Sequence, residues 1–238
     1  MNKKIMLLAL AAISSAMFAM PSLASAELLP LHMTPTPAKL DMHGVGKTIL
    51  RSSGGTITCN GLTSASSATP EAGGTTGTMT LRFGGECKHS LLGTCTSSSP
   101  ADSSGFITTT PLPYHLVTID TGVTPASPGV LVTPGSGGAF AHFNCGFAQV
   151  TVEGNGVLGT ITSPACGGTS STATISFLAS PAGSTTQQHR FTEGSTAEKT
   201  TGPWSLSVGG NPASMEAHAT LTATDAKGIS MNTTLSCK

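Results

Sequence analysis

The stretch that decides the fold is an unbroken alternation at residues 215–223, Met215-Glu216-Ala217-His218-Ala219-Thr220-Leu221-Thr222-Ala223. Every odd position carries an apolar side chain, and every even position carries a polar one. Because successive side chains of a β-strand point to opposite faces of a sheet, this pattern predicts a long strand with one buried face.

Shorter runs of the same period occur at 78–83, 148–152, 173–177 and 204–208. No helical period of about ten residues or more follows the first 26 residues. The sequence therefore predicts an all-β fold, either an antiparallel Greek-key sandwich or two packed β-sandwich or barrel domains.

The connections between these strands can be predicted only coarsely. Residues 229–235 are expected to form the hairpin partner of the long strand, after a turn at Asp225-Ala226-Lys227-Gly228. Two stretches rich in turn-forming residues, 96–104 and 121–138, are expected to be surface loops.

The N-terminal end divides into two segments. Residues 1–26 combine a basic start, an apolar run and the small-residue site Ala24-Ser25-Ala26, and this order is typical of a secretory signal peptide. Residues 27–43 contain three prolines and are predicted to form an extended lead-in or an edge strand.

The β-rich region is expected at 44–238, and it could consist of two halves that meet near residue 145. The hint of two halves is the tetrapeptide Gly-Thr-Ile-Thr, which occurs at 55–58 and again at 159–162. One domain and two domains both stay open on this weak signal.

Charge argues against two classes of partner. The whole chain has 11 basic and 11 acidic residues, and removal of the signal peptide takes Lys3 and Lys4 with it. No basic patch marks a nucleic-acid site, and no polybasic segment marks a membrane anchor. We expect no integral membrane segment once the signal has been removed.

Export to an oxidising compartment makes disulfides the natural interpretation of the six cysteines, which are Cys59, Cys87, Cys95, Cys145, Cys166 and Cys237. Six cysteines allow 15 pairings, and the sequence does not choose between them. From spacing we expect Cys87 with Cys95 across a short loop. Cys59 and Cys145 each end an alternating run and could join neighbouring strands, which leaves Cys166 with Cys237. The irregular spacing and the absence of a C-x-x-C motif argue against metal.

A family resemblance rests on six stretches, which are Leu-Pro-Leu-His-Met-Thr-Pro-Thr-Pro at 29–37, Gly-Gly-Thr-Ile-Thr-Cys at 54–59, Phe-Gly-Gly-Glu-Cys at 83–87, Ile-Thr-Thr-Thr-Pro-Leu-Pro-Tyr-His-Leu-Val at 107–117, Phe-Ala-His-Phe-Asn-Cys-Gly at 140–146 and Gly-Asn-Gly-Val-Leu-Gly-Thr-Ile-Thr-Ser-Pro-Ala-Cys at 154–166. In their order and spacing they resemble a family of secreted, cysteine-containing bacterial proteins of the actinobacterial type, to which no function is assigned. The resemblance covers most of residues 29–180. It implies a secreted, β-rich, cysteine-bridged protein and carries over no catalytic residue.

Few residues point to chemistry. Asp120-Thr121-Gly122 follows an apolar strand and resembles the aspartic-protease triplet, but that chemistry needs two carboxylates and the chain has no second copy. A hydrolase that uses Asp120 is therefore the weakest hypothesis. No pattern predicts a catalytic constellation, a metal site or a cofactor.

Binding is the other open possibility. Sugar or lipid platforms use exposed aromatic rings, and Tyr114 and Trp204 are the candidates that the sequence offers. The leading hypothesis is a secreted or cell-envelope structural or interaction module without catalytic activity. Its expected partner is a cell-surface polymer or a second copy of the chain, and a glycan- or lipid-binding module is the alternative.

Overall fold

The computed structural model describes residues 31–71, 74–97, 105–120, 127–179, 190–193, 198–200 and 205–237. Every regular element in these ranges is a β-strand, which confirms the predicted all-β fold. No helix in this part of the chain has the length and hydropathy that crossing a membrane requires. The predicted signal peptide at 1–26 lies outside the described residues.

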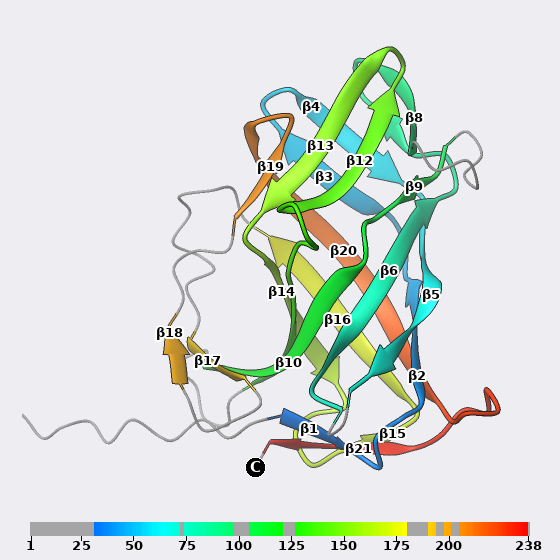
Figure 1. Ribbon diagram of the computed structural model, residues 1–238, viewed down its shortest axis with the longest axis vertical. Coiled ribbons are helices and arrows are strands. Elements are labelled where there is room, and N and C mark those ends of the chain that lie inside the picture. Colours follow the sequence, from blue (N-terminus) through cyan, green and yellow to red (C-terminus); the bar gives the residue numbers. More distant parts are fainter. Residues whose placement is uncertain are drawn as a thin grey trace, which may run out of the picture.

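Eight of the described strands pair in a closed antiparallel circuit that we name the lower ring (Figure 1). Each member is hydrogen-bonded to the next, and the last strand returns to the first. In ring order, the strands are β2 (Lys39–Gly44), β5 (Gly61–Pro70), β6 (Thr76–Gly84), β10 (Leu112–Asp120), β11 (Ser127–Val132), β14 (Val157–Ser163), β16 (Thr172–Ala179) and β20 (Asn211–Thr224).

A second closed circuit, the upper ring, stands on the first and shares β20 with it (Figure 1). All of its described pairs are antiparallel as well. From β20 the order runs through β3 (Thr48–Ser52), β4 (Gly55–Cys59), β7 (Lys88–His89), β8 (Gly93–Ser97), β12 (Ala139–Cys145), β13 (Ala148–Gly154) and β19 (Leu206–Val208).

The long alternating strand β20 joins the two rings. Its first residues pair with β3 and β19, and its later residues pair with β16 and β2. Ala217 and Ala219 are completely buried inside the ring, while Thr220 and Thr222 lie on the outer face with partial exposure. The period-two pattern thus predicted a strand whose apolar face lines the interior of the protein.

The chain does not divide between the rings at residue 145. Strands from both sides of this position occur in each ring, and one continuous cluster of buried side chains fills both. The repeated tetrapeptide falls in β4 of the upper ring and in β14 of the lower ring. That the two strands derive from duplicated halves of the chain stays a hypothesis.

A small sheet caps the lower ring at the end that holds the last described residue (Figure 1). Its order is β1 (Leu31–Thr34), β21 (Thr233–Cys237) and β15 (Thr169–Ser170). Leu31, Met33 and Leu235 reach from it into the main core. The disulfide between Cys166 and Cys237 ties this cap to the turn after β14. This pair was expected only as the one left over after two other pairs had been assigned.

Two predicted connections were wrong. Residues 229–235 do not form a hairpin with β20, because β21 pairs with β1 and β15 and only an isolated bridge joins Thr224 to Ser230. The predicted loop at 121–138 contains β11, a ring strand between β10 and β14. Pro128 and Gly129 suggested a turn there, but the buried run Val130-Leu131-Val132 makes a strand.

The predicted lead-in at 27–43 contributes two different strands. β1 lies at an edge of the cap. β2 is one of the strands that form the lower ring, and it pairs with β5 on one side and with β20 on the other. The short strands β9 (Ile107–Thr108), β17 (Arg190–Glu193) and β18 (Glu198–Thr200) extend the pairing from β6 and β10.

Candidate functional site

The end of the upper ring opposite the cap contains the β12–β13 turn, and the β7–β8 turn lies beside it (Figure 1). Leu91 lies in the turn between β7 and β8 and is 78% exposed. Phe147 lies in the turn between β12 and β13 and is 96% exposed. We name Leu91 and Phe147 together the apolar tip. An aromatic side chain that is almost fully exposed gains almost no stabilisation from burial in its own protein. Such exposure is unusual for Phe and suggests a contact with a partner outside the protein.

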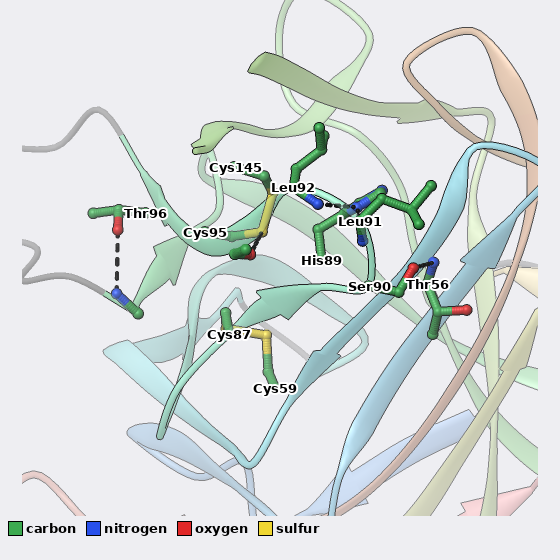
Figure 2. Close-up of a disulfide and its surroundings, with 12 residues drawn as sticks. Thr56, Cys59, Cys87, His89, Ser90, Leu91, Leu92, Cys95, Thr96 and Cys145 are labelled. Carbon is green, nitrogen blue, oxygen red and sulfur yellow. Dashed lines mark hydrogen bonds between the residues drawn. A yellow bond between two sulfur atoms is a disulfide. The ribbon is translucent and has the colours of Figure 1, made fainter. Parts of the chain in front are cut away.

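His89 organises the first turn of the tip. Its side chain is almost buried, and Nδ1 accepts hydrogen bonds from the backbone N–H groups of Leu91 at 3.1 Å and Leu92 at 3.2 Å (Figure 2). The backbone N–H of Ser90 donates to the carbonyl of Thr56 in β4 at 2.8 Å, and Ser90 Oγ accepts from the N–H of Thr56 at 3.1 Å. The exposed Leu91 side chain therefore stands on a turn whose backbone is held from two sides.

The second turn is as short as a β-hairpin allows. Cys145 pairs with Ala148, so the loop consists of Gly146 and Phe147 alone. Gly146 has φ +56° at the first central position, which is typical of a type II′ turn. It donates its N–H to the carbonyl of Thr94 at 3.0 Å, and a Cβ there would lie 2.5 Å from the carbonyl oxygen of Leu92. The two turns therefore lie side by side, and the contact requires glycine.

Two disulfides lie near the β7–β8 turn that carries Leu91 (Figure 2). Cys95 of β8 is bonded to Cys145 of β12, and Cys59 of β4 is bonded to Cys87 just before β7. The predicted pairs of Cys87 with Cys95 and of Cys59 with Cys145 were wrong. All four cysteines are buried, and the N–H of Cys95 donates to the carbonyl of Cys87. Spacing correctly suggested that these two are neighbours, but cross-strand register places Cys95 opposite Cys145.

Near Leu91, one basic and one acidic side chain form an ion pair. Lys88 Nζ lies 3.0 Å from Glu86 Oε2, and both side chains are exposed. An exposed pair of this kind contributes little to stability, but it leaves no net charge beside the apolar side chains. The tip therefore offers an apolar contact without an electrostatic preference from these two groups.

Tyr114, which the sequence proposed as an exposed platform, lies in the core of the lower ring. It is 1% exposed and faces Gly77 across the β10–β6 pair, where an added Cβ would meet the ring at 2.6 Å. The glycine makes room for the ring, and the ring covers the glycine. An exposed platform at Tyr114 is therefore not formed, because packing against Gly77 hides the aromatic face.

The buried hydroxyl of Tyr114 has no hydrogen-bond partner among the residues that the structure describes. Burial raises the pKa of this hydroxyl well above its ordinary value, and the negative charge of Glu71 raises the pKa further. The folded protein therefore holds the neutral phenol at a pH where an unfolded chain would release its proton.

This burial makes stability sensitive to alkali. Above about pH 10 the unfolded state releases the proton and the folded state keeps it, so stability should fall by up to about 1.4 kcal/mol per pH unit. Below that pH the contribution is fully present. Urea unfolding between about pH 8 and about pH 11 measures the slope. Tyr114→Phe, the control, has no proton to release and should lose less; equal slopes in both proteins would contradict the assignment.

The structure describes little of the other two candidate functional residues, Trp204 and Asp120. Trp204 lies outside the described residues. Asp120 is the last residue of β10 and its backbone pairs with Arg190, but its side chain and the following Thr121 and Gly122 lie outside the described part. The structure therefore adds nothing to the hydrolase hypothesis.

One polar pair was not anticipated from the sequence. Ser176 Oγ lies 3.0 Å from Nδ1 of His218 across the β16–β20 pair on the outer face of the ring. A Ser–His catalytic site also needs a carboxylate on the imidazole and a place for the substrate. Neither residue lines a cavity described here, and in the described part of the chain no three His, Cys, Asp or Glu side chains gather as a metal site would require.

An apolar cavity of about 100 Å³ lies inside the protein where the two rings meet. No polar atom faces it, although Thr48 and Thr109 contribute to its wall. The Thr109 hydroxyl is already engaged, because it accepts a hydrogen bond from the N–H of Leu81 at 2.9 Å.

Comparison of the chain with protein-family models, with curated proteins and with solved structures finds no match. The resemblance to secreted bacterial proteins stays a prediction. The apolar tip was missed at the sequence level, although a signal was present: Leu92 and Phe147 are large apolar residues that stand directly beside Gly93 and Gly146.

Proposed function

We propose that this protein is an extracellular binding module that attaches reversibly to a lipid surface through the apolar tip. Its three disulfides point to an oxidising, extracellular environment. The observation that carries the proposal is the exposure of Phe147 and Leu91 on adjacent turns that are cross-linked by Cys95–Cys145. The proposal corresponds to the lipid-binding alternative from the sequence, but it places the contact at the apolar tip and not at Tyr114 or Trp204.

The energy available from the tip suits a weak, reversible attachment. Full burial of a Phe or Leu side chain contributes about 1.5–3 kcal/mol each. The turns are already ordered by His89 and by the disulfide, so insertion into lipid costs little further conformational entropy. The sum is similar to the marginal membrane affinity of a single myristoyl chain.

A lipid surface fits this geometry better than a protein partner does. A stable protein interface buries about 800 Å² on each side and requires shape complementarity. Two side chains that project from separate tight turns offer a small and uneven apolar area. The acyl region of a membrane accepts such projections without a matching shape. Because Lys88 and Glu86 neutralise one another, the proposal requires no anionic lipid.

The test is co-sedimentation of the full mature chain with neutral phosphatidylcholine vesicles. The wild type should bind at low and at high salt, because an apolar contact is not screened. Leu91→Ser with Phe147→Ser should lower the partition coefficient onto the vesicles about a hundredfold or more, since each lost side chain removes more than about 1.4 kcal/mol, which is tenfold.

A matched control uses the other large exposed apolar residues of the described chain. Val45 is 56% exposed at the β2–β3 turn, and Ile229 is 61% exposed in the loop before β21. Val45→Ser with Ile229→Ser removes two exposed apolar side chains of smaller exposed area away from the tip and should leave vesicle binding unchanged. Equal losses in both double variants, or no binding by the wild type, would overturn the proposal.

A further inference from the structure

The cavity at the junction of the rings is independent of the tip and points to a second binding site. Four of the eight phenylalanines in the chain converge on its wall, and these are Phe83, Phe140, Phe143 and Phe177. They come from β6, β12 and β16, so both rings contribute to the wall. The remaining wall is mostly aliphatic.

The position of the cavity follows from the architecture. Lining residues of the upper ring, such as Val152 and Leu206, face lining residues of the lower ring, such as Leu112 and Val157. Where one closed ring passes into the other, side chains of the shared interior must fill a wide cross-section. Ala141 and Thr48 are small residues at this level, and their size leaves space that the phenylalanine rings do not reach.

We propose that this cavity binds a small, uncharged hydrocarbon molecule of about the size of benzene. Its volume of about 100 Å³ is of the same order as an engineered apolar cavity of about 150 Å³ that stays dry and binds benzene or xenon. A water molecule needs two or more polar partners, and this wall has no polar atom facing inward. The cavity therefore favours an apolar occupant over water.

The same wall excludes the polar ligands that the sequence left open. A sugar would bury hydroxyl groups without partners, and an ionised group would lose its hydration. Thr48 and Thr109 carry the hydroxyl groups of the wall, and neither presents a polar atom to the cavity. Met215 lines the cavity with a flexible, polarisable side chain, which can adjust around an occupant.

The test measures the midpoint of thermal unfolding of the full mature protein with and without benzene. A ligand that binds only the folded state raises the midpoint in proportion to its occupancy. We expect the wild type to shift upward by a few degrees and to show no shift with glycerol at equal concentration. Xenon-129 NMR provides a second readout, in which the wild type should show a concentration-dependent shift of the xenon signal.

Ala141→Leu fills the cavity from β12 and should abolish both effects while it raises the midpoint without ligand. If this variant does not fold, Val157→Leu adds a single methylene to the same wall and should weaken benzene binding. Val130→Leu is the matched control, because Val130 is buried in the lower ring but does not line the cavity. It should retain the benzene shift.

Two results would overturn the proposal: no benzene or xenon effect in the wild type, or an unchanged effect in the cavity-filled variant. The proposal is separable from the lipid contact, since Ala141→Leu leaves Leu91 and Phe147 in place. A cavity-filled protein should still sediment with vesicles, and the tip double variant should still bind benzene.

Discussion

Replacing Cys95 and Cys145 with alanine should lower the free energy of unfolding by about 4 kcal/mol. The bond closes a loop with a sequence separation of 50 residues, and it does not overlap the loops closed by the other two bonds. In the chain-entropy model, a loop of this length corresponds to roughly 4 kcal/mol. Both side chains are completely buried, so alanine avoids the added penalty of buried serine hydroxyls.

Urea unfolding under non-reducing conditions measures this loss. The control is the pair Cys166→Ala with Cys237→Ala, which opens a loop with a separation of 71 residues at the opposite end of the protein. It should lose a similar amount of stability, about 4–5 kcal/mol. A loss below about 1 kcal/mol in the Cys95 and Cys145 variant would contradict the expected role of the bond.

The two disulfide variants also separate stability from function. Cys95–Cys145 links the two hairpins that carry Leu91 and Phe147, whereas Cys166–Cys237 holds the cap. At a temperature where both variants stay folded, vesicle binding should weaken in the first and persist in the second. Equal binding by the two variants would show that the lipid contact does not depend on a stapled tip.

The second large effect is expected from Phe177→Ala, with a loss of about 3–5 kcal/mol. Phe177 lies on β16, is buried and pairs across the sheet with Gly159 of β14. Its ring also lines the central cavity, so truncation would enlarge that void instead of letting the core collapse. Urea unfolding of the variant checks the loss, and a change below about 1 kcal/mol would contradict the packing.

A double-mutant cycle with Gly159→Ala gives this prediction a control. A Cβ at position 159 would lie 2.6 Å from Cε1 of Phe177 and 2.9 Å from Cγ2 of Ile175. Gly159→Ala should therefore destabilise the wild type by about 1–3 kcal/mol through overpacking. In the Phe177→Ala background the clash with the ring is gone and only the contact with Ile175 remains, so the same change should cost clearly less than in the wild type. An unchanged penalty in both backgrounds would show that the ring does not set the requirement for glycine.

Several strands were predictable because their signal is local. Residues 78–83, 148–152, 173–177 and 215–223 alternate in polarity, and each lies within a strand of the structure. Alternation reports which side chains share a face, and a strand with one face in a core must show it. The all-β class follows from many such segments in a chain without a helical period.

The errors concern partners that are distant along the chain. Residues 229–235 carry a strand pattern, but nothing local says that β21 pairs with β1, which lies some two hundred residues earlier. The cysteines near the tip show the same limit. Four of them cluster near two turns, and only the register of β8 against β12 decides that Cys95 meets Cys145.

Burial was equally hard to predict for single aromatic residues. Tyr114 follows Pro113 at the entrance to a strand and could have faced solvent, yet Gly77 on the neighbouring strand provides the space that buries it. Phe147 stands two residues after a buried cysteine and could have joined the core, yet a two-residue turn projects it outward.

The order of residues was thus enough to predict strands, a buried face and a protein built for an oxidising compartment, because polarity alternation and cysteine content are properties of short segments. The folded chain decided how the rings close, which cysteines pair, where the cavity lies and which aromatic ring faces solvent. Each of these depends on side chains that meet only after strands far apart in the sequence have paired, and their pairing is settled by the packing of the whole interior.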